Sequence, residues 1–276
     1  MLFRSELERV IRNPAESYVD KRRNAVWTVT RIENAESLRL VRLALDDPDA
    51  TVRHAALNSV SLRRDAQATA QLVKLLSNGT AVQQRVAAEA LGRIGDRSVV
   101  PALLKRAEDP QFMGDRVREH ALIYALIELG DATSVRKAVA STVPGVRRAA
   151  MMALDQMPLR VAVEGAGLDP YEVGPLLHST EATLREAASW LVGRHPEWGD
   201  ALADGMAARL ESLPDDANAR LALASQLSRF AGQPGIQSLL AKTASGGSSP
   251  AAVVAMTAMR DSGLRELPPD WVKALL

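Results

Sequence analysis

The chain has 276 residues, of which 47% are hydrophobic, 24% charged and 4% aromatic, and its formal net charge is +1. This composition excludes a disordered segment, and the dominance of Ala, Leu and Val disfavours a large β-sandwich. The chain contains no cysteine. Disulfides, cysteine-ligated zinc, iron–sulfur clusters, covalently attached haem and thiol nucleophiles are therefore excluded together.

Targeting signals do not assign the protein to a compartment. No apolar run approaches the ~20 residues that a membrane-spanning helix needs. The N-terminal stretch MLFRSELERVIRNP carries five charged side chains and lacks the apolar core of a signal peptide. The signal of an exported parent protein would have to lie outside this chain. Charge is uneven: residues 1–160 hold 25 basic and 19 acidic residues, a net +6, and residues 161–276 hold 9 and 14, a net −5.

After a short helix expected over residues 1–13, one pattern recurs: an Arg followed two or three residues later by Ala within a helical segment. The marker arginines are Arg22, Arg53, Arg85, Arg118, Arg147, Arg185 and Arg220. Their successive separations are 31, 32, 33, 29, 38 and 35 residues, and residues 251–255 form a degenerate further copy. Such a period is typical of a solenoid of helix pairs.

We therefore predict an all-α, right-handed α-solenoid of seven or eight helix pairs that forms a single array over residues 1–276. Residues 1–160 are expected to hold regular repeats. Residues 161–276 are expected to hold more divergent repeats and a C-terminal cap, in which Trp271 covers the last helix. The spacing between marker arginines becomes longer after Met157, where glycines and prolines predict an irregular loop between repeats.

Each repeat is expected to pair a short helix with a long one that carries the marker Arg. In the long helices, apolar residues lie one position before the Arg and one and two turns later, as in Val52, Ala56 and Val60. Gly-Asp pairs end two of the long helices, at Gly95 and Gly130. Acidic residues precede several marker arginines by four positions, which predicts a ladder of ion pairs: Asp49 with Arg53, Glu181 with Arg185, and Asp216 with Arg220.

Three segments carry a resemblance to a known family: VRHAALNSV, QRVAAEALGRIGDRSVVPALLKRAED and VRRAAMMALDQM. They resemble the HEAT-like repeat family, in the short form named after phycocyanobilin-lyase repeats. The resemblance covers residues 18–160 well and implies a fold far more than a function. The segments RRNAVWTVTRI, REHALIYALIELGD and GRHPEWG also look like the HEAT section of large exported proteins that join a dehydrogenase-like propeller to a c-type cytochrome. The haem motif CxxCH is absent, so redox chemistry does not transfer.

The positions of the histidines test whether the sequence contains a metal site. Some HEAT proteins bind two irons through repeated His-Glu dyads. Here the residues that follow His54, His120, His178 and His195 are Ala, Ala, Ser and Pro, so the dyad does not occur. We predict no functional metal, haem or other cofactor, and we interpret His120 as a packed, hydrogen-bonded residue.

Two enzymatic alternatives stay open. HEAT-like DNA glycosylases for alkylated bases use a basic concave face with aromatics, and Trp27 and Trp190 occupy equivalent positions five residues after their marker Arg. A pI near 8.1 disfavours a dedicated nucleic-acid binder. A bilin-lyase-like protein is implied only by the name of the repeat. No GxGxxG, Walker A, GxSxG or HExxH motif is present.

The favoured interpretation is a non-enzymatic binding module whose concave helical surface contacts another protein or a neighbouring domain, with no nucleic acid and no membrane span. No catalytic, cofactor-binding or metal-binding residue is predicted. On each long helix, the positions +1, +5 and +8 from the marker Arg share one face. The candidate partner-binding residues on that row are Arg23, Trp27, His54, Asn58, Arg93, Arg148 and Trp190.

Overall fold

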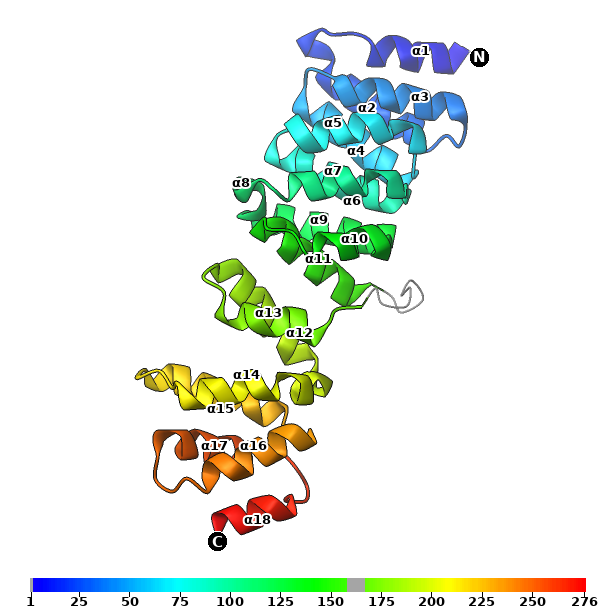
Figure 1. Ribbon diagram of the computed structural model, residues 1–276. Helices are drawn as coiled ribbons and strands as arrows, with labels where there is room; N and C mark the ends of the chain where they lie inside the picture. Colours follow the sequence, from blue (N-terminus) through cyan, green and yellow to red (C-terminus); the bar gives the residue numbers. More distant parts are fainter. Residues whose placement is uncertain (1, 158–166) are drawn as a thin grey trace. The chain divides into compact units, whose positions relative to one another are not determined.

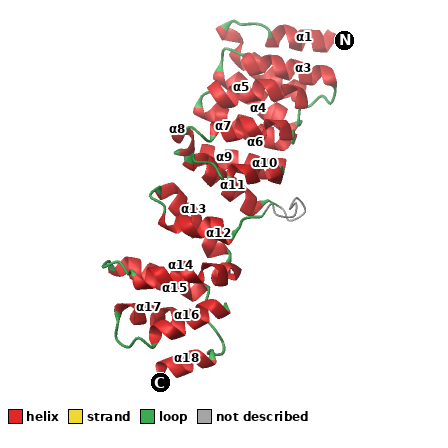
Figure 2. Ribbon diagram, in the orientation of Figure 1, coloured by secondary structure: helices red, strands yellow, loops and turns green. Residues whose placement is uncertain are grey.

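The computed structural model describes residues 2–157 and 167–276, and within those ranges it contains helices and no strand (Figures 1 and 2). This confirms the all-α prediction. The chain forms two compact units, unit 1 over Met1–Gly167 and unit 2 over Leu168–Leu276. The irregular loop predicted after Met157 falls largely on residues 158–166, which lie outside the described residues.

Unit 1 is a stack of helix pairs, each with a first helix and a longer second one (Figure 1). The pairs are α1 (Leu2–Ile11) with α2 (Val19–Thr30), α3 (Ala35–Leu43) with α4 (Ala50–Leu62), α5 (Thr69–Asn78) with α6 (Ala81–Ile94), α7 (Val100–Arg106) with α9 (Arg116–Leu129), and α10 (Ala132–Ala138) with α11 (Pro144–Gln156). A one-turn helix, α8 (Pro110–Met113), is inserted before α9. The second helices pack on one another in succession, which is the arrangement of an α-solenoid.

The predicted apolar stripe forms the core of the stack. Val52, Ala56 and Val60 of α4 are fully buried. Helices α6 and α9 approach so closely that a Cβ atom on Gly92 would lie 2.8 Å from the Cα of Ala125. Small residues on the stripe therefore set the spacing between repeats, as a densely packed interior requires.

Turn chemistry determines where the second helices end and begin. Gly95 (φ +82°) and Gly130 (φ +60°) cap α6 and α9 in the left-handed conformation that glycine adopts without strain. At the other end, Asp49 accepts hydrogen bonds from the backbone N–H groups of Thr51 and Val52 and so caps α4. The two glycine ends had been predicted from the sequence.

Unit 2 contains α12 (Pro170–Val173), the 3₁₀ helix η6 (Gly174–His178), α13 (Ala182–Arg194), α14 (Gly199–Glu211), α15 (Ala217–Arg229), α16 (Pro234–Ala244), α17 (Pro250–Arg260) and α18 (Pro269–Leu275). Helices α12 and η6 pack on α13, α14 packs on α16, and α15 packs on α17. Trp271 of α18 is fully buried, and its indole N–H donates to the Gln237 carbonyl at 2.9 Å. Trp271 and α18 thus pack on α16, whereas Trp271 had been predicted to cover the last helix.

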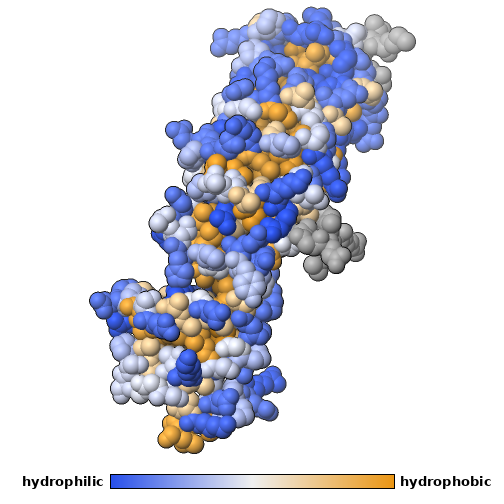
Figure 3. Space-filling model, viewed as in Figure 1, coloured by the Kyte–Doolittle hydropathy of each residue, from blue (hydrophilic) through white to orange (hydrophobic). Residues whose placement is uncertain are grey.

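Figure 3 shows apolar residues toward the middle of the drawn face and mostly hydrophilic residues along its edges. Among the helices that the structure describes, none has the length and apolar character needed to cross a bilayer.

Candidate functional site

Marker arginines such as Arg53 and Arg185 donate hydrogen bonds to the turns that precede their own helices. Arg53 donates from Nη1 to the carbonyl oxygens of Asp47 (2.6 Å) and Pro48 (2.7 Å). Arg185 binds the Ser179 and Thr180 carbonyls in the same way. These side chains satisfy carbonyl groups that the turns leave without a helical partner.

The predicted acid–arginine ladder is wrong. Arg53 and Arg185 bind carbonyl oxygens, and Arg220 binds the Pro214 carbonyl and Asp215. Asp216 caps α15 by accepting from the Ala219 N–H, as Asp49 caps α4. A carboxylate at the N-cap position points toward the free N–H groups of its helix, so spacing alone does not identify its partner.

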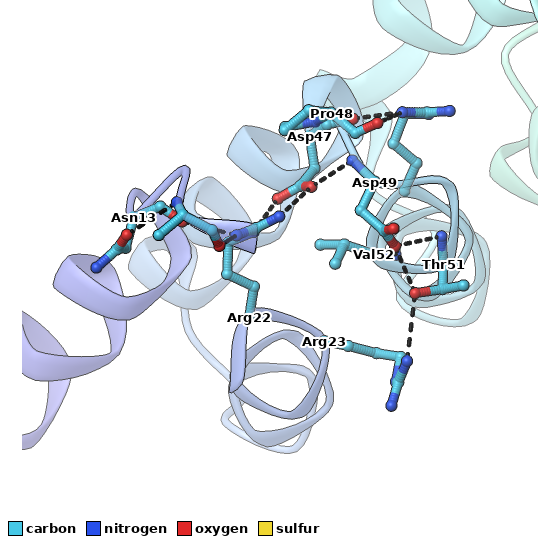
Figure 4. A network of polar contacts seen from close by, with 10 residues as sticks. Asn13, Arg22, Arg23, Asp47, Pro48, Asp49, Thr51 and Val52 are labelled. Carbon is cyan, nitrogen blue, oxygen red and sulfur yellow. Dashed lines mark hydrogen bonds and ion pairs between the residues drawn. The ribbon is translucent and has the colours of Figure 1, made fainter. Parts of the chain in front are cut away.

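Arg22 forms the most enclosed polar network of unit 1 (Figure 4). Its Nε and Nη2 donate to Asp47 at 2.7 and 3.0 Å, and its Nη1 donates to the carbonyls of Asn13 and Ala15, both at 2.8 Å. The Arg22 and Asp47 side chains are 2% and 4% exposed. Asp47 also accepts from the Asp49 N–H. Because these charges are paired, hydrogen-bonded and enclosed, we assign this network to the fold and not to ligand binding.

Five of the predicted partner-binding residues lie on the adjacent helices α2, α4 and α6. We call them the long-helix face: Arg23, Trp27, His54, Asn58 and Arg93. Polar contacts link the three helices here: Arg23 donates to the Thr51 hydroxyl at 3.3 Å, and Arg93 donates to the Ser61 hydroxyl at 3.2 Å. The Trp27 side chain is 41% exposed, and none of the five residues is fully buried.

The predicted row is interrupted beyond this face. In α6 the equivalent positions are Val86 and Ala90, which are 2% and 0% exposed because α6 packs closely on α9. On α11, Arg148 forms an ion pair with the buried Glu119 of α9. Trp190, 40% exposed, belongs to unit 2, where the Arg194 guanidinium lies 4.7 Å from its ring centroid. The structure therefore gathers five of the seven residues on neighbouring helices.

Sequence reasoning missed the exposed side of α9. Val117 and Tyr124 are 60% and 44% exposed, although Val117 occupies the stripe position that is buried in α4. The interpretation of His120 as a packed residue is wrong, because it is exposed and stacks on Tyr124 with 6.4 Å between ring centroids. We attribute this exposure to the inserted helix α8. Arg118 of α9 donates to the Gln111 carbonyl of α8 and to the Gln84 side chain of α6, and α9 exposes a different face to solvent from its neighbours.

The histidines do not form a metal site among the described residues. They lie on α4, α9, η6 and the C-terminal end of α13, and no group of three or more His, Cys, Asp or Glu residues is placed to hold an ion in the described ranges. The donor set of those residues thus does not fit a metal pair held by His-Glu dyads. His195 instead pairs with Glu197 at 2.6 Å and stacks on Trp198.

Successive helix pairs, with arginines that bind the turns between them, give the chain the architecture of an α-helical repeat protein. The family described as PBS lyase HEAT-like repeat matches residues 83–109, which contain most of α6 and all of α7. A curated relative, deoxyhypusine hydroxylase of Drosophila melanogaster, is 29% identical over 114 residues, which are 40% of this chain and 38% of the relative. The chain therefore matches well under half of that relative's length.

Solved structures that are similar to this chain have low sequence identity to it. Human deoxyhypusine hydroxylase in complex with glycerol is 19% identical, with a TM-score of 0.37 and coverage of 95% of this chain and 96% of that one. An archaeal HEAT-like repeats protein from Thermococcus onnurineus NA1 is 13% identical, with a TM-score of 0.45 and coverage of 99% and 98%.

These comparisons correct the prediction of a non-enzymatic binding module. The curated relative is an enzyme. The prediction was drawn from the lack of local catalytic motifs. In a repeat array a site is assembled from side chains on different repeats, so the lack of a local motif is weak evidence against catalysis.

Proposed function

We propose that the protein takes part in an enzymatic reaction on another protein, and that the long-helix face of unit 1 binds that substrate. The enzymatic part rests on the similarity to deoxyhypusine hydroxylase. The binding part rests on Trp27, a large aromatic side chain left 41% exposed among polar neighbours on a rigid helical layer. Exposed tryptophan and arginine side chains are the types that most often anchor protein interfaces.

The charge of the face indicates the kind of protein surface it fits. Arg23 and Arg93 give the face positive charge, and the His54 ring lies between them in the order of the helices α2, α4 and α6. Arg23 is paired with the exposed Asp20 at 2.6 Å, and such a surface pair is worth little and exchanges readily. An acidic segment with an apolar residue would complement both the arginines and the Trp27 ring.

The test combines binding with chemistry. A photo-reactive amino acid placed at Trp27 should crosslink the substrate in cells, and Trp27→Ser in the wild-type background should reduce its co-purification by about tenfold, the loss of a single interface anchor. Val117→Ser is the control, because Val117 is 60% exposed but lies on α9, outside the long-helix face. It should leave co-purification unchanged.

Mass spectrometry of the captured protein decides the enzymatic part. Its side chains should differ covalently between cells that contain this protein and cells that lack it. An identical mass spectrum in the two strains would contradict the enzymatic part and leave the binding part standing. Equal losses for Trp27→Ser and Val117→Ser would contradict the assignment of the face.

A second proposal concerns the parent protein: we propose that this chain is the HEAT section of a larger exported protein that also contains a dehydrogenase-like propeller and a c-type cytochrome. It rests on the segments beginning at Arg22, Arg118 and Gly193. Sequencing the flanks of the gene tests it: a propeller upstream and a CxxCH motif downstream would support it, and unrelated flanks would reject it.

A further inference from the structure

Unit 2 contains a cavity of about 420 Å³. It lies where α13, α14 and α15 meet. Arg185, Ser189, Arg209, Ser225, Gln226 and Arg229 line it, with a few apolar or small residues. Its volume is within the range of small-molecule sites in proteins.

The lining is strongly basic. Three arginines line the cavity, of which Arg185 and Arg229 are exposed and Arg209 is half-buried, and none of its lining residues is acidic. Arg185 is held by carbonyl oxygens, and Arg209 donates to the Gln226 side-chain carbonyl. None of the three arginines forms an ion pair with the described residues. An arginine cluster without counter-ions is electrostatically unfavourable unless an anion or solvent compensates it.

Arg209 is the most enclosed of the three. Burial lowers the pKa of its guanidinium, and no carboxylate opposes that effect. An arginine side chain stays protonated in proteins even so. Its charge therefore remains in the cavity wall, available to a bound anion.

The backbone makes room for Arg229. A Cβ atom on Gly193 of α13 would lie 2.7 Å from Nη1 of Arg229, closer than side-chain atoms normally approach. The guanidinium of α15 thus lies against the helix backbone at Gly193. Together with Ser189 and Ala222, this glycine leaves the space between α13 and α15 that the cavity occupies.

We propose that this cavity binds the phosphate group of a small phosphate monoester. Guanidinium groups donate paired hydrogen bonds that match phosphate oxygens, and the hydroxyls of Ser189 and Ser225 and the Gln226 amide add neutral donors. Three uncompensated positive charges match a phosphate dianion better than a singly charged carboxylate.

An adjoining cavity indicates what the phosphate carries. It has a volume of about 270 Å³, shares Leu177 and Arg209 with the basic cavity, and is lined mainly by apolar residues such as Tyr171, Leu202 and Met206. An aryl or alkyl group attached to the phosphate would bury apolar surface there, which favours binding. The expected ligand is therefore a phosphate monoester with an apolar substituent.

Isothermal titration calorimetry of the full chain tests the proposal with phenyl phosphate, inorganic phosphate and sodium acetate. Phenyl phosphate should bind most tightly, inorganic phosphate more weakly and acetate least. Arg229→Gln should weaken phenyl phosphate binding by about tenfold or more, the scale of one lost charge-assisted contact. Arg265→Gln, which removes the same charge from an exposed residue outside both cavities, should change it less than about twofold.

Gly193→Ala tests the geometry without changing charge. The added methyl group meets the flexible end of Arg229, so the variant should fold, with wild-type circular dichroism, while phenyl phosphate binding weakens. If Gly193→Ala unfolds, Arg229→Gln still decides the case.

Two results would overturn the proposal: equal weakening by Arg229→Gln and Arg265→Gln, or phosphate binding no tighter than acetate binding. If inorganic phosphate binds as tightly as phenyl phosphate, the apolar substituent is rejected and the site is one for free phosphate. A phosphoserine peptide that binds more tightly than phenyl phosphate would reject the small-molecule ligand.

Discussion

Arg22 illustrates how a single residue ties several elements of unit 1 together. It lies on α2, and its guanidinium reaches the segment after α1 through the Asn13 and Ala15 carbonyls and the turn before α4 through Asp47. Both charges are removed from water, so each depends on the other for compensation. The cost of removing one partner is therefore larger than the net contribution of the pair.

Asp47→Ala should destabilise the protein by about 3–5 kcal/mol, because it leaves the Arg22 charge buried without its carboxylate. Urea denaturation followed by circular dichroism measures this. Asp20→Ala is the control: Asp20 pairs with Arg23 on the surface, and its loss should change stability by less than about 1 kcal/mol. The double variant Arg22→Met with Asp47→Leu should recover part of the loss. Equal effects of the two alanine variants would show that the buried pair has no special role.

At the scale of elements, helix N-caps make stability depend on pH. Hydrogen bonds from the Thr51 hydroxyl and from the Thr51 and Val52 N–H groups lower the pKa of Asp49 below its ordinary value. Backbone N–H groups likewise lower the pKa of Asp109 and Asp115. A carboxyl group with a lowered pKa in the folded state stabilises the fold above its unfolded pKa, near about 4, and loses that contribution as the pH falls through the folded value.

Thermal unfolding between pH 7 and pH 2 should therefore show a falling melting temperature below about pH 4. Asp49→Asn keeps an N-cap acceptor but cannot titrate, so it should reduce that pH dependence with little effect at pH 7. Asp270→Asn is the control, because Asp270 is exposed and pairs only with nearby Lys273 among the described contacts. If the wild type and Asp49→Asn have the same pH profile, the Asp49 cap is not a source of acid sensitivity.

Much of the element arrangement could be predicted from the sequence because helix pairs and their stripes follow local periodicity. Val52, Ala56 and Val60 are buried as the spacing of 3.6 residues per turn requires, and Gly95 and Gly130 end helices as predicted. The exposed side of α9 could not be predicted. Periodicity defines which residues share a face, whereas the neighbouring α8 and α6 decide which face solvent reaches.

The candidate sites likewise divide into one that sequence periodicity could predict and one that only tertiary packing reveals. Arg23, Trp27 and His54 could be placed on one face because they occupy equivalent positions in successive repeats. The basic cavity could not be found in this way: Arg185 is a marker residue, but Arg209 comes from α14, a first helix without the marker, and Arg229 follows its marker Arg220 by nine residues. Only the packing of α13, α14 and α15 brings the three guanidiniums together.

At the scale of the whole molecule, a stack of repeats transmits a local defect to its neighbours first. Each second helix of unit 1 packs on the next, and unit 2 has its own buried residues, such as Trp271 and Phe230. Stability in such arrays is close to a sum of repeat and neighbour contributions, so damage is expected to stay near its origin. The Arg22–Asp47 pair lies within the first two helix pairs and offers a way to observe this.

Hydrogen exchange monitored by mass spectrometry should show that Asp47→Ala speeds exchange in α1 to α4 and leaves α14 to α17 at the wild-type rate. Faster exchange follows because opening of the first two repeats no longer breaks a compensated buried ion pair. Measurements at low temperature, where the variant stays folded by circular dichroism, separate local opening from global unfolding. Uniformly faster exchange across both units would mean that the chain unfolds as one cooperative body, and the nearest-neighbour description would then be wrong for this protein.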